Sequence, residues 1–222
     1  MKETKKAILE LLSKKSNGKK SSKFDSLVLN LALQKVDSDD FEFDGEAVYT
    51  TDKECLIYLV SNTTNFVIPE GVVTIGEMAF RSKKHLKSVT IASTVETIEK
   101  DAFYDCDDLE TVFIPAQVKT IRAYSFAECD SLKQVIFAGV PDKLSRHTFD
   151  DSDNIHRIII PQGSFKGFKK ALHYNSDEEY KLLEKPATDD NAADNKPKAS
   201  AAKAEASTSD QAPKDEKNKN KK

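Results

Sequence analysis

The stretch that decides the fold spans residues 86–137 and reads LKSVTIASTVETIEKDAFYDCDDLETVFIPAQVKTIRAYSFAECDSLKQVIF. One pattern occurs in it three times: Leu86, Leu109 and Leu132, which are 23 residues apart, are each followed by Val and then by Ile or Phe at the same spacing. The same period extends outward on both sides without a gap. It extends the Val column to Phe66, Val89, Val112, Val135 and Ile158, and the next column to Ile68, Ile91, Ile114, Phe137 and Ile160. It also aligns two further apolar columns: Ile75, Ile98, Ile121 and Leu144; and Phe80, Phe103, Phe126 and Phe149. A fixed period of this length predicts a solenoid of stacked units.

Each unit is expected to hold a short strand, a turn and a compact segment. Val89 and Ile91 alternate with a polar residue, so one face of their strand is buried. A turn that contains proline follows in three of the units, and then a segment such as residues 98–103, which is too short for much more than one helical turn. We therefore predict an α/β solenoid with a parallel concave sheet and short helical or 3-10 turns on its convex side. The Phe column is expected to pack as an aromatic spine rather than to line a ligand groove.

The chain divides into five predicted segments. They are a basic helical cap or linker (residues 1–40), a β-hairpin that opens the solenoid (41–65), the repeats (66–163), a closing helical region (164–185) and a disordered tail rich in Lys, Ala and Asp (186–222). The tail contains no Leu, Ile, Val or aromatic residue and has nothing to bury. Residues 2–15 and 25–36 are expected to be helices, although alternation in the second also fits a strand. The apolar face of the closing helix is assigned to Phe165, Phe168, Leu172 and Tyr174.

The units VTIASTVETIEKDAFYDCDDLETVFIP and KTIRAYSFAECDSLKQVIF closely resemble BspA-type leucine-rich repeats. FDGEAVYTTDKECLIYLVSNTTNFVIPEGV resembles the β-hairpin that precedes such repeats, and IIIPQGSFKGFKKAL resembles the Pro-x-Gly turn and helix that follow them. The resemblance covers roughly residues 41–174 and implies a leucine-rich-repeat solenoid. It also implies adhesin-like binding of host or extracellular proteins when such a module is exported. The fourth unit departs from the pattern at Val140, Pro141 and Thr148.

Composition and charge exclude several classes of protein. No apolar run approaches the ~18 residues that span a bilayer, so no transmembrane segment is expected. The net charge of −3 conceals +5 in residues 1–25, −9 in 26–185 and +1 in 186–222. An acidic middle argues against a nucleic-acid groove. The apolar stretch AILELL is too short for a secretory signal, which predicts a cytoplasmic protein; a secreted or cell-surface protein is expected if Met1 is not the native start or if export is non-standard.

The residues that could carry chemistry do not converge. The four His residues fall in different phases of the repeat, and no hydrolase, phosphate-loop or zinc-protease motif occurs. We expect no catalytic residue, no cofactor and no enzymatic activity. Cys106 and Cys129 share one column, which continues at Ser152. They are expected to be buried reduced thiols, although adjacent units could bring them within disulfide range.

Acidic residues form two columns of their own: Asp105, Glu128 and Asp151, and Asp107, Asp130 and Asp153. Stacked carboxylates could bind a hard cation such as calcium. The alternative is a solvated loop edge that keeps the solenoid soluble. We favour the solvated edge and assign no metal site, because Ser82 and Lys84 replace the acids in the first unit.

The candidate binding site follows from strand alternation. The residues between the buried positions should face outward on the concave sheet. One outward column is mostly apolar, namely Val67, Thr90, Phe113, Ile136 and Ile159, and Gln134 and Arg157 stand beside it in a polar column. Contiguous exposed apolar surface marks interaction sites. The alternatives are that β-propensity alone selected these residues or that the caps fold over them.

Two functions of different classes follow. The first is a monomeric, non-catalytic module that binds a partner protein through the concave sheet, adhesin-like if exported and a scaffold if intracellular. The second is a structural spacer or tether whose basic N-terminus docks RNA or an anionic membrane surface.

Overall fold

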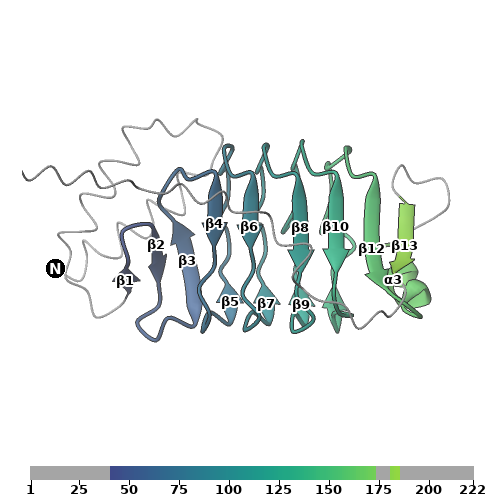
Figure 1. The fold of residues 1–222 in the computed structure, drawn as a ribbon, viewed down its shortest axis with the longest axis horizontal. Coiled ribbons are helices and arrows are strands. Elements are labelled where there is room, and N and C mark those ends of the chain that lie inside the picture. The colour runs from purple at the N-terminus through teal and green to yellow at the C-terminus, as the bar shows by residue number, and fades with distance from the viewer. Residues whose placement is uncertain (1–40, 174–180, 186–222) are drawn as a thin grey trace, which may run out of the picture.

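The structure is a computed structural model that describes residues 41–173 and 181–185. It is a β-solenoid in which successive units stack along the long axis of the molecule (Figure 1). This confirms the predicted solenoid. The expected N-terminal helices, Tyr174 and the tail from residue 186 lie outside the described residues.

Parallel strands form one side of the solenoid, which we call the long-strand sheet, and those of the repeats are 23 residues apart. Its strands are β4 (Asn65–Val67), β6 (Ser88–Thr90), β8 (Thr111–Ile114), β10 (Gln134–Phe137), β12 (Arg157–Pro161) and β13 (Lys181–Lys185). β4 pairs with β6, and β8, β10, β12 and β13 pair in that order; β6 and β8 lie next to each other on this side but are not paired as strands. Val135 is in register with Val112 on one side and Ile158 on the other. The sequence columns are therefore rows of neighbours across the sheet.

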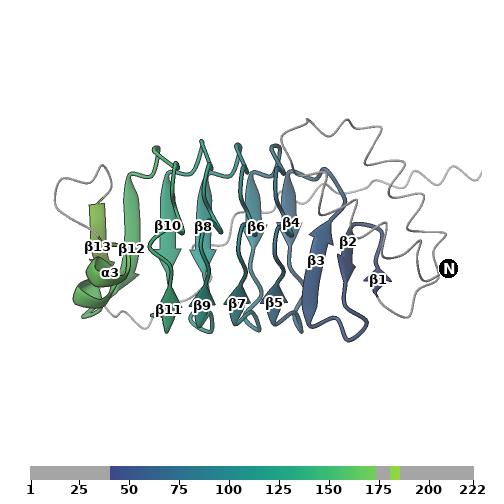
Figure 2. The same ribbon diagram turned by 180° about the vertical axis from the view of Figure 1, so that it is seen from behind.

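A second sheet runs along the opposite side, and we call it the short-strand sheet (Figure 2). Its repeat strands have two residues each: β5 (Thr74–Ile75), β7 (Thr97–Ile98), β9 (Thr120–Ile121) and β11 (Lys143–Leu144). The antiparallel strands β1 (Glu42–Phe43), β2 (Ala47–Tyr49) and β3 (Cys55–Leu59) precede them, and β3 pairs in parallel with β5. The opening hairpin is thus continuous with this sheet.

The compact segments between the two sheets consist of hydrogen-bonded turns, where the sequence suggested short helices. Each segment donates to the next unit: the Phe80 N–H donates to the Ala102 carbonyl at 2.7 Å, and the Phe103 N–H donates to the Ser125 carbonyl at 2.8 Å. Backbone groups inside the solenoid find their partners in a neighbouring unit, as buried amides require.

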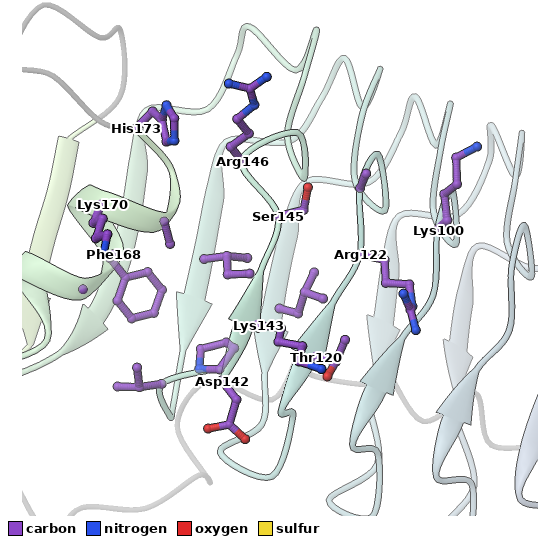
Figure 3. A pocket seen from close by; sticks show the side chains of 17 residues that line it. Lys100, Thr120, Arg122, Asp142, Lys143, Ser145, Arg146, Phe168, Lys170 and His173 are labelled. Atoms are coloured by element: carbon purple, nitrogen blue, oxygen red, sulfur yellow. The ribbon is translucent and has the colours of Figure 1, made fainter.

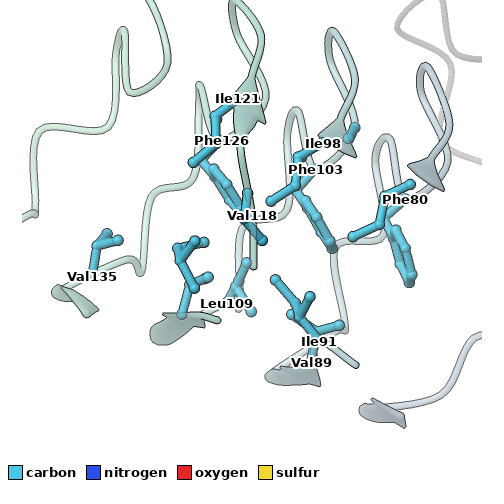
Figure 4. Close-up of a cluster of buried hydrophobic side chains, with 14 of the residues drawn as sticks. Phe80, Val89, Ile91, Ile98, Phe103, Leu109, Val118, Ile121, Phe126 and Val135 are labelled. Carbon is cyan, nitrogen blue, oxygen red and sulfur yellow. The ribbon is translucent and has the colours of Figure 1, made fainter. Parts of the chain in front are cut away.

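The core is a continuous apolar column between the sheets (Figure 4). Phe80, Phe103 and Phe126 are fully buried. Phe80 and Phe103 stack at 4.5 Å between ring centroids, and Phe126 stacks on the half-buried Phe149 at 6.0 Å. The predicted aromatic spine is confirmed.

The C-terminal end differs from the predicted closing helix. The helix α3 (Phe165–Ala171) buries Phe168, which packs edge-on against Phe137. Leu172, just after it, is also buried, but Phe165 is 38% exposed, so its expected place on the apolar face is wrong. After α3 the chain returns to the long-strand sheet as β13, a strand that the sequence did not predict. β13 has no counterpart in the 23-residue period, which is why the periodicity missed it.

Candidate functional site

The seven predicted binding residues lie on one face of the long-strand sheet. Pairing places Val67 beside Thr90, Phe113 beside Ile136, and Ile136 beside Ile159. Val67 is 65% exposed, and Thr90, Phe113 and Ile159 are half-buried. Gln134 is half-buried and Arg157 exposed, and the two are in register with each other. Alternation therefore assigned the face correctly.

Ile136 departs from the expectation, because it is only 7% exposed. It is in register with Phe113 on one side and Ile159 on the other, so large side chains flank it. The expectation that Ile136 faces solvent is wrong. Alternation identifies the face of a strand, whereas the neighbouring side chains decide how much of a residue they cover.

The structure adds a residue that the repeat does not contain. β13 brings Leu183 into register with Ile159, and Leu183 is 41% exposed. The sequence signal was the apolar pair Leu182–Leu183 between charged residues, outside the period. We call the resulting row the apolar stripe: Val67, Thr90, Phe113, Ile136, Ile159 and Leu183.

Side chains of the preceding unit bind the first acidic residue of each column, Asp105 and Asp107. Lys84 Nζ lies 2.8 Å from Asp105 Oδ1 and 2.7 Å from Asp107 Oδ2. The Ser82 hydroxyl also donates to Asp105, at 2.8 Å. Partial burial works against the charge of Lys84, but the two carboxylates raise its pKa above the ordinary value. A lysine from the preceding unit therefore occupies the place where a cation would need these oxygens.

The later acidic residues have separate surroundings. Glu128 accepts a hydrogen bond from the Tyr104 hydroxyl, and the backbone carbonyl of Asp130 accepts one from Asn154. Asp151 and Asp153 are exposed. In residues 41–173 and 181–185, no group of three or more His, Cys, Asp or Glu side chains is arranged to hold a metal ion.

One acidic column shares a backbone conformation. The φ angles are 57° at Ser82, 60° at Asp105, 52° at Glu128 and 58° at Asp151. These values lie in the left-handed region, which Asp tolerates better than most residues with a side chain. The common property of this column is thus a tight turn at a fixed place in each unit.

The cysteine column is a ladder of hydrogen bonds inside the solenoid. The Cys106 thiol donates to the Phe80 carbonyl at 3.1 Å, and the Cys129 thiol donates to the Phe103 carbonyl at 3.2 Å. Burial raises the pKa of Cys106 well above its usual value and that of Cys129 to about 12. Both are buried free thiols, as predicted.

The same column begins with a buried lysine. Lys83 is 8% exposed, and its Nζ lies 3.4 Å from the Val60 carbonyl and 3.5 Å from the Ser61 carbonyl. It also lies 4.8 Å from the centre of the Tyr58 ring. Burial lowers the pKa of Lys83 to about 8. Its position in the first unit, where the sequence shows only a surface-like run of charges, concealed this burial.

A cavity of about 890 Å³ lies beside β11 and α3 (Figure 3). Phe168 and Lys170 reach it from the helix, and Lys143 and Leu144 from β11. The sequence did not predict it, because it forms where the repeat ends and the helix begins.

No helix in the described part of the chain has both the length and the apolar character to cross a membrane.

The comparisons with known proteins agree with this architecture. A family model described as BspA type Leucine rich repeat region matches residues 52–178 in six copies, and no curated protein matches the chain. A leucine-rich repeat protein from Eubacterium ventriosum ATCC 27560 has a TM-score of 0.55 at 21% identity, covering 67% of this chain and 40% of that protein. A leucine rich cell surface protein from Faecalibacterium prausnitzii A2-165 has a TM-score of 0.52 at 23% identity, covering 68% and 41%. The chain thus spans about two fifths of either protein, and the likeness shows the fold.

Proposed function

We propose, from the premise that the chain belongs to the BspA-type leucine-rich repeat family, that it is a non-catalytic module that binds a partner protein through its long-strand sheet. The observation that carries the proposal is the apolar stripe. Val67 and Leu183 are large apolar residues exposed at 65% and 41%, and half-buried Phe113 and Ile159 lie between them. Apolar residues in a row on an otherwise charged protein are typical of an interaction surface.

The chemistry of the stripe suits a protein partner. An aromatic residue near the centre of an apolar row can anchor an interface, and polar residues such as Gln134 and Arg157 can form its rim. Parallel pairing holds Val67 and Thr90 in register with each other, and Phe113, Ile136, Ile159 and Leu183 in register with one another, so the partner meets two rigid parts of one surface. On a cell surface, which is where the description of the F. prausnitzii protein places that molecule, the module would act as an adhesin. Inside a cell the same face would serve a scaffold.

The test compares capture of a partner by matched variants. Immobilised protein is exposed to culture medium and to cell lysate, and bound proteins are identified by mass spectrometry. Val67→Ser with Phe113→Ser should abolish retention of the partner while the circular dichroism spectrum stays unchanged. Glu96→Ser with Lys119→Ser is the control, because it removes an exposed 2.9 Å ion pair near the short-strand sheet.

Two results would contradict the proposal. Capture that survives the change in the stripe would place binding elsewhere. Capture that is lost on deleting residues 1–25 but not in the stripe variant would favour a tether that docks through its basic N-terminus.

A further inference from the structure

In one set of backbone hydrogen bonds along the short-strand sheet, each unit donates to carbonyl groups of the unit before it. The Glu99 N–H donates to the Ile75 carbonyl at 3.0 Å, the Arg122 N–H to the Ile98 carbonyl at 3.0 Å, and the Ser145 N–H to the Ile121 carbonyl at 3.0 Å. A parallel set joins the Thr120 N–H to the Glu96 carbonyl and the Lys143 N–H to the Lys119 carbonyl. Each unit therefore offers two carbonyl groups to the unit that follows.

This ladder ends at β11. The carbonyl groups that should accept next, by the 23-residue period, are those of Asp142 and Leu144. Within residues 41–173 and 181–185, neither accepts a hydrogen bond and no strand pairs with β11 on the side away from β9. The helix α3 follows at this end instead of another short strand, and the cavity lies between it and β11 (Figure 3). An open strand edge is a template for pairing with another chain.

The lining of the cavity indicates the chemistry of that chain. Buried Phe168 and half-buried Leu144 and Ala171 supply apolar surface. The basic lining residues are Lys100, Arg122, Lys143, Arg146 and Lys170, with His173 beside them, whereas Asp142 is the one acidic residue among those that line it. Such a concentration of positive charge stands out on a region whose net charge is −9 over residues 26–185.

Some of these basic side chains form ion pairs with described residues, and others do not. Arg122 is paired with Glu99 at 2.7 Å, and Lys100 lies 3.8 Å from Asp101. Lys143 and Lys170 make no ion pair with any other described residue. Two lysines on opposite walls of the cavity are therefore available to a negatively charged ligand.

We propose that this cavity binds a short extended acidic segment of a partner protein, which adds a parallel strand to β11. Main-chain hydrogen bonds to the Asp142 and Leu144 carbonyl groups supply affinity, as in other cases of strand addition. Carboxylates of the segment meet Lys143 and Lys170, which selects acidic sequences. The site is on the opposite sheet from the apolar stripe and does not depend on the proposed function.

The register of the existing strands predicts the pattern of the segment. The N–H groups of Lys143 in β11 and of Ser145 just after it donate to the preceding unit, and Leu144 between them packs against the core. An added strand in the same register would place an apolar side chain next to Leu144 and Phe168. The residues flanking it would donate their N–H groups to β11 and carry the carboxylates. The expected ligand therefore alternates acidic and apolar residues.

The probe is a short fluorescein-labelled peptide in which Glu and Leu alternate, titrated with the full chain and followed by fluorescence anisotropy. Saturable binding is expected, and it should weaken as salt is raised. A peptide with Lys in place of Glu should not bind. N-methylation of the Glu amides should weaken binding by about tenfold or more, which corresponds to about 1.4 kcal/mol, whereas N-methylation of the Leu amides should not, because those N–H groups point away from β11.

Two variants of the protein locate the site. Lys143→Glu with Lys170→Glu should remove binding, and Lys87→Glu with Lys133→Glu, at exposed lysines outside the cavity, should not. Gly167→Trp should also block it, because Gly167 lines the cavity and a Cβ there has nothing within 4 Å; its circular dichroism spectrum should match that of the parent. Retained binding in either cavity variant would overturn the proposal. So would equal binding of the Lys peptide or of the peptide methylated at Glu.

Self-association of the chain is the competing occupant. In sedimentation velocity, the protein alone should not associate as its concentration rises, and the Gly167→Trp variant should behave in the same way. Association of the parent protein that Gly167→Trp removes would assign the cavity to a second copy and would overturn the proposal of a separate acidic partner.

Discussion

Phe103 and Phe126 stack nearly face to face from adjacent units, with ring centroids 4.9 Å apart and ring planes inclined by 4°. Both rings are fully buried. Their separation matches the ~4.8 Å between neighbouring strands, so the aromatic column and the two sheets advance by the same step. Side-chain packing and backbone pairing therefore stabilise the same stacking of units.

Phe103→Ala and Phe126→Ala should each lower the free energy of unfolding by roughly 3–5 kcal/mol, because each leaves a cavity in a filled core. Phe165→Ala, at a 38% exposed side chain, is the control and should cost much less. Urea denaturation measures the three changes. Hydrogen exchange should show the loss of protection spreading to the neighbouring units, since they share the interface. A Phe103→Ala protein that melts like its parent would contradict the role given to the stack.

Lys83→Met should change the pH dependence of stability. Lys83 has a pKa of about 8 in the folded protein and an ordinary value of 10.5, so the unfolded chain binds more protons between these values. Its contribution to stability is therefore unfavourable below pH 8, and the penalty disappears as the pH rises from 8 to 10.5. The stability of the Met variant relative to the parent should fall by about 3 kcal/mol over that range.

The measurement is urea denaturation of both proteins between pH 7 and pH 10.5. Lys87→Met, which removes an exposed lysine, controls for loss of a lysine without burial. A difference between Lys83→Met and the parent that does not vary with pH would show that the lysine is solvated in the folded protein.

The three cysteines should differ in reactivity. Thiol–disulfide exchange needs the thiolate, and burial raises the pKa of Cys106, Cys129 and Cys55. Cys55 is half-buried, whereas the other two are buried, so Cys55 should react first with Ellman's reagent. Cys106 and Cys129 should react only on unfolding in guanidinium. Release of three equivalents at one rate in the native protein would disprove the buried ladder.

Two glycines should respond oppositely to alanine. A Cβ at Gly139 would lie 2.7 Å from the Cα and carbonyl oxygen of Ala116, one unit earlier, and the backbone would have to shift. Gly139→Ala should therefore cost roughly 1–3 kcal/mol. Gly167 is within α3 and has open space around it, so Gly167→Ala should stabilise by about 0.5–1 kcal/mol. Thermal unfolding of both variants tests the pair, and equal effects would refute the close approach of adjacent units at Gly139.

The sequence predicted the features that recur from one unit to the next. Columns such as Phe80 to Phe126 predict the strand spacing, the buried face and the aromatic core, because each residue there has the same surroundings as its equivalent 23 positions away. The cysteine ladder was predictable for the same reason, and Ser152 continues it with a 2.8 Å hydrogen bond to the Phe126 carbonyl.

What the sequence missed depends on neighbours that the period does not specify. Ile136 is covered by the residues on either side of it, Leu183 arrives on a strand from outside the repeat, and Lys83 is buried against the opening hairpin. The cavity beside β11 forms because, in the described part of the chain, α3 lies there in place of another short strand. Lys83, Leu183 and the cavity lie where the repeats contact a part of the chain that does not repeat, whereas Ile136 is covered by the sizes of its own neighbours.

The hydrogen bonds between Gly71 and Thr94, Ser88 and Asn65, and Cys129 and Ser152 all connect residues 23 positions apart. Because contacts between neighbouring units recur at this interval, a tandem duplication of the coding sequence for a single unit would insert another unit with contacts of the same kind. The protein would grow by one step of the stack, and both of its ends would be unchanged. Evolution can therefore alter the reach of this molecule in a single genetic event while leaving its packing chemistry as it is.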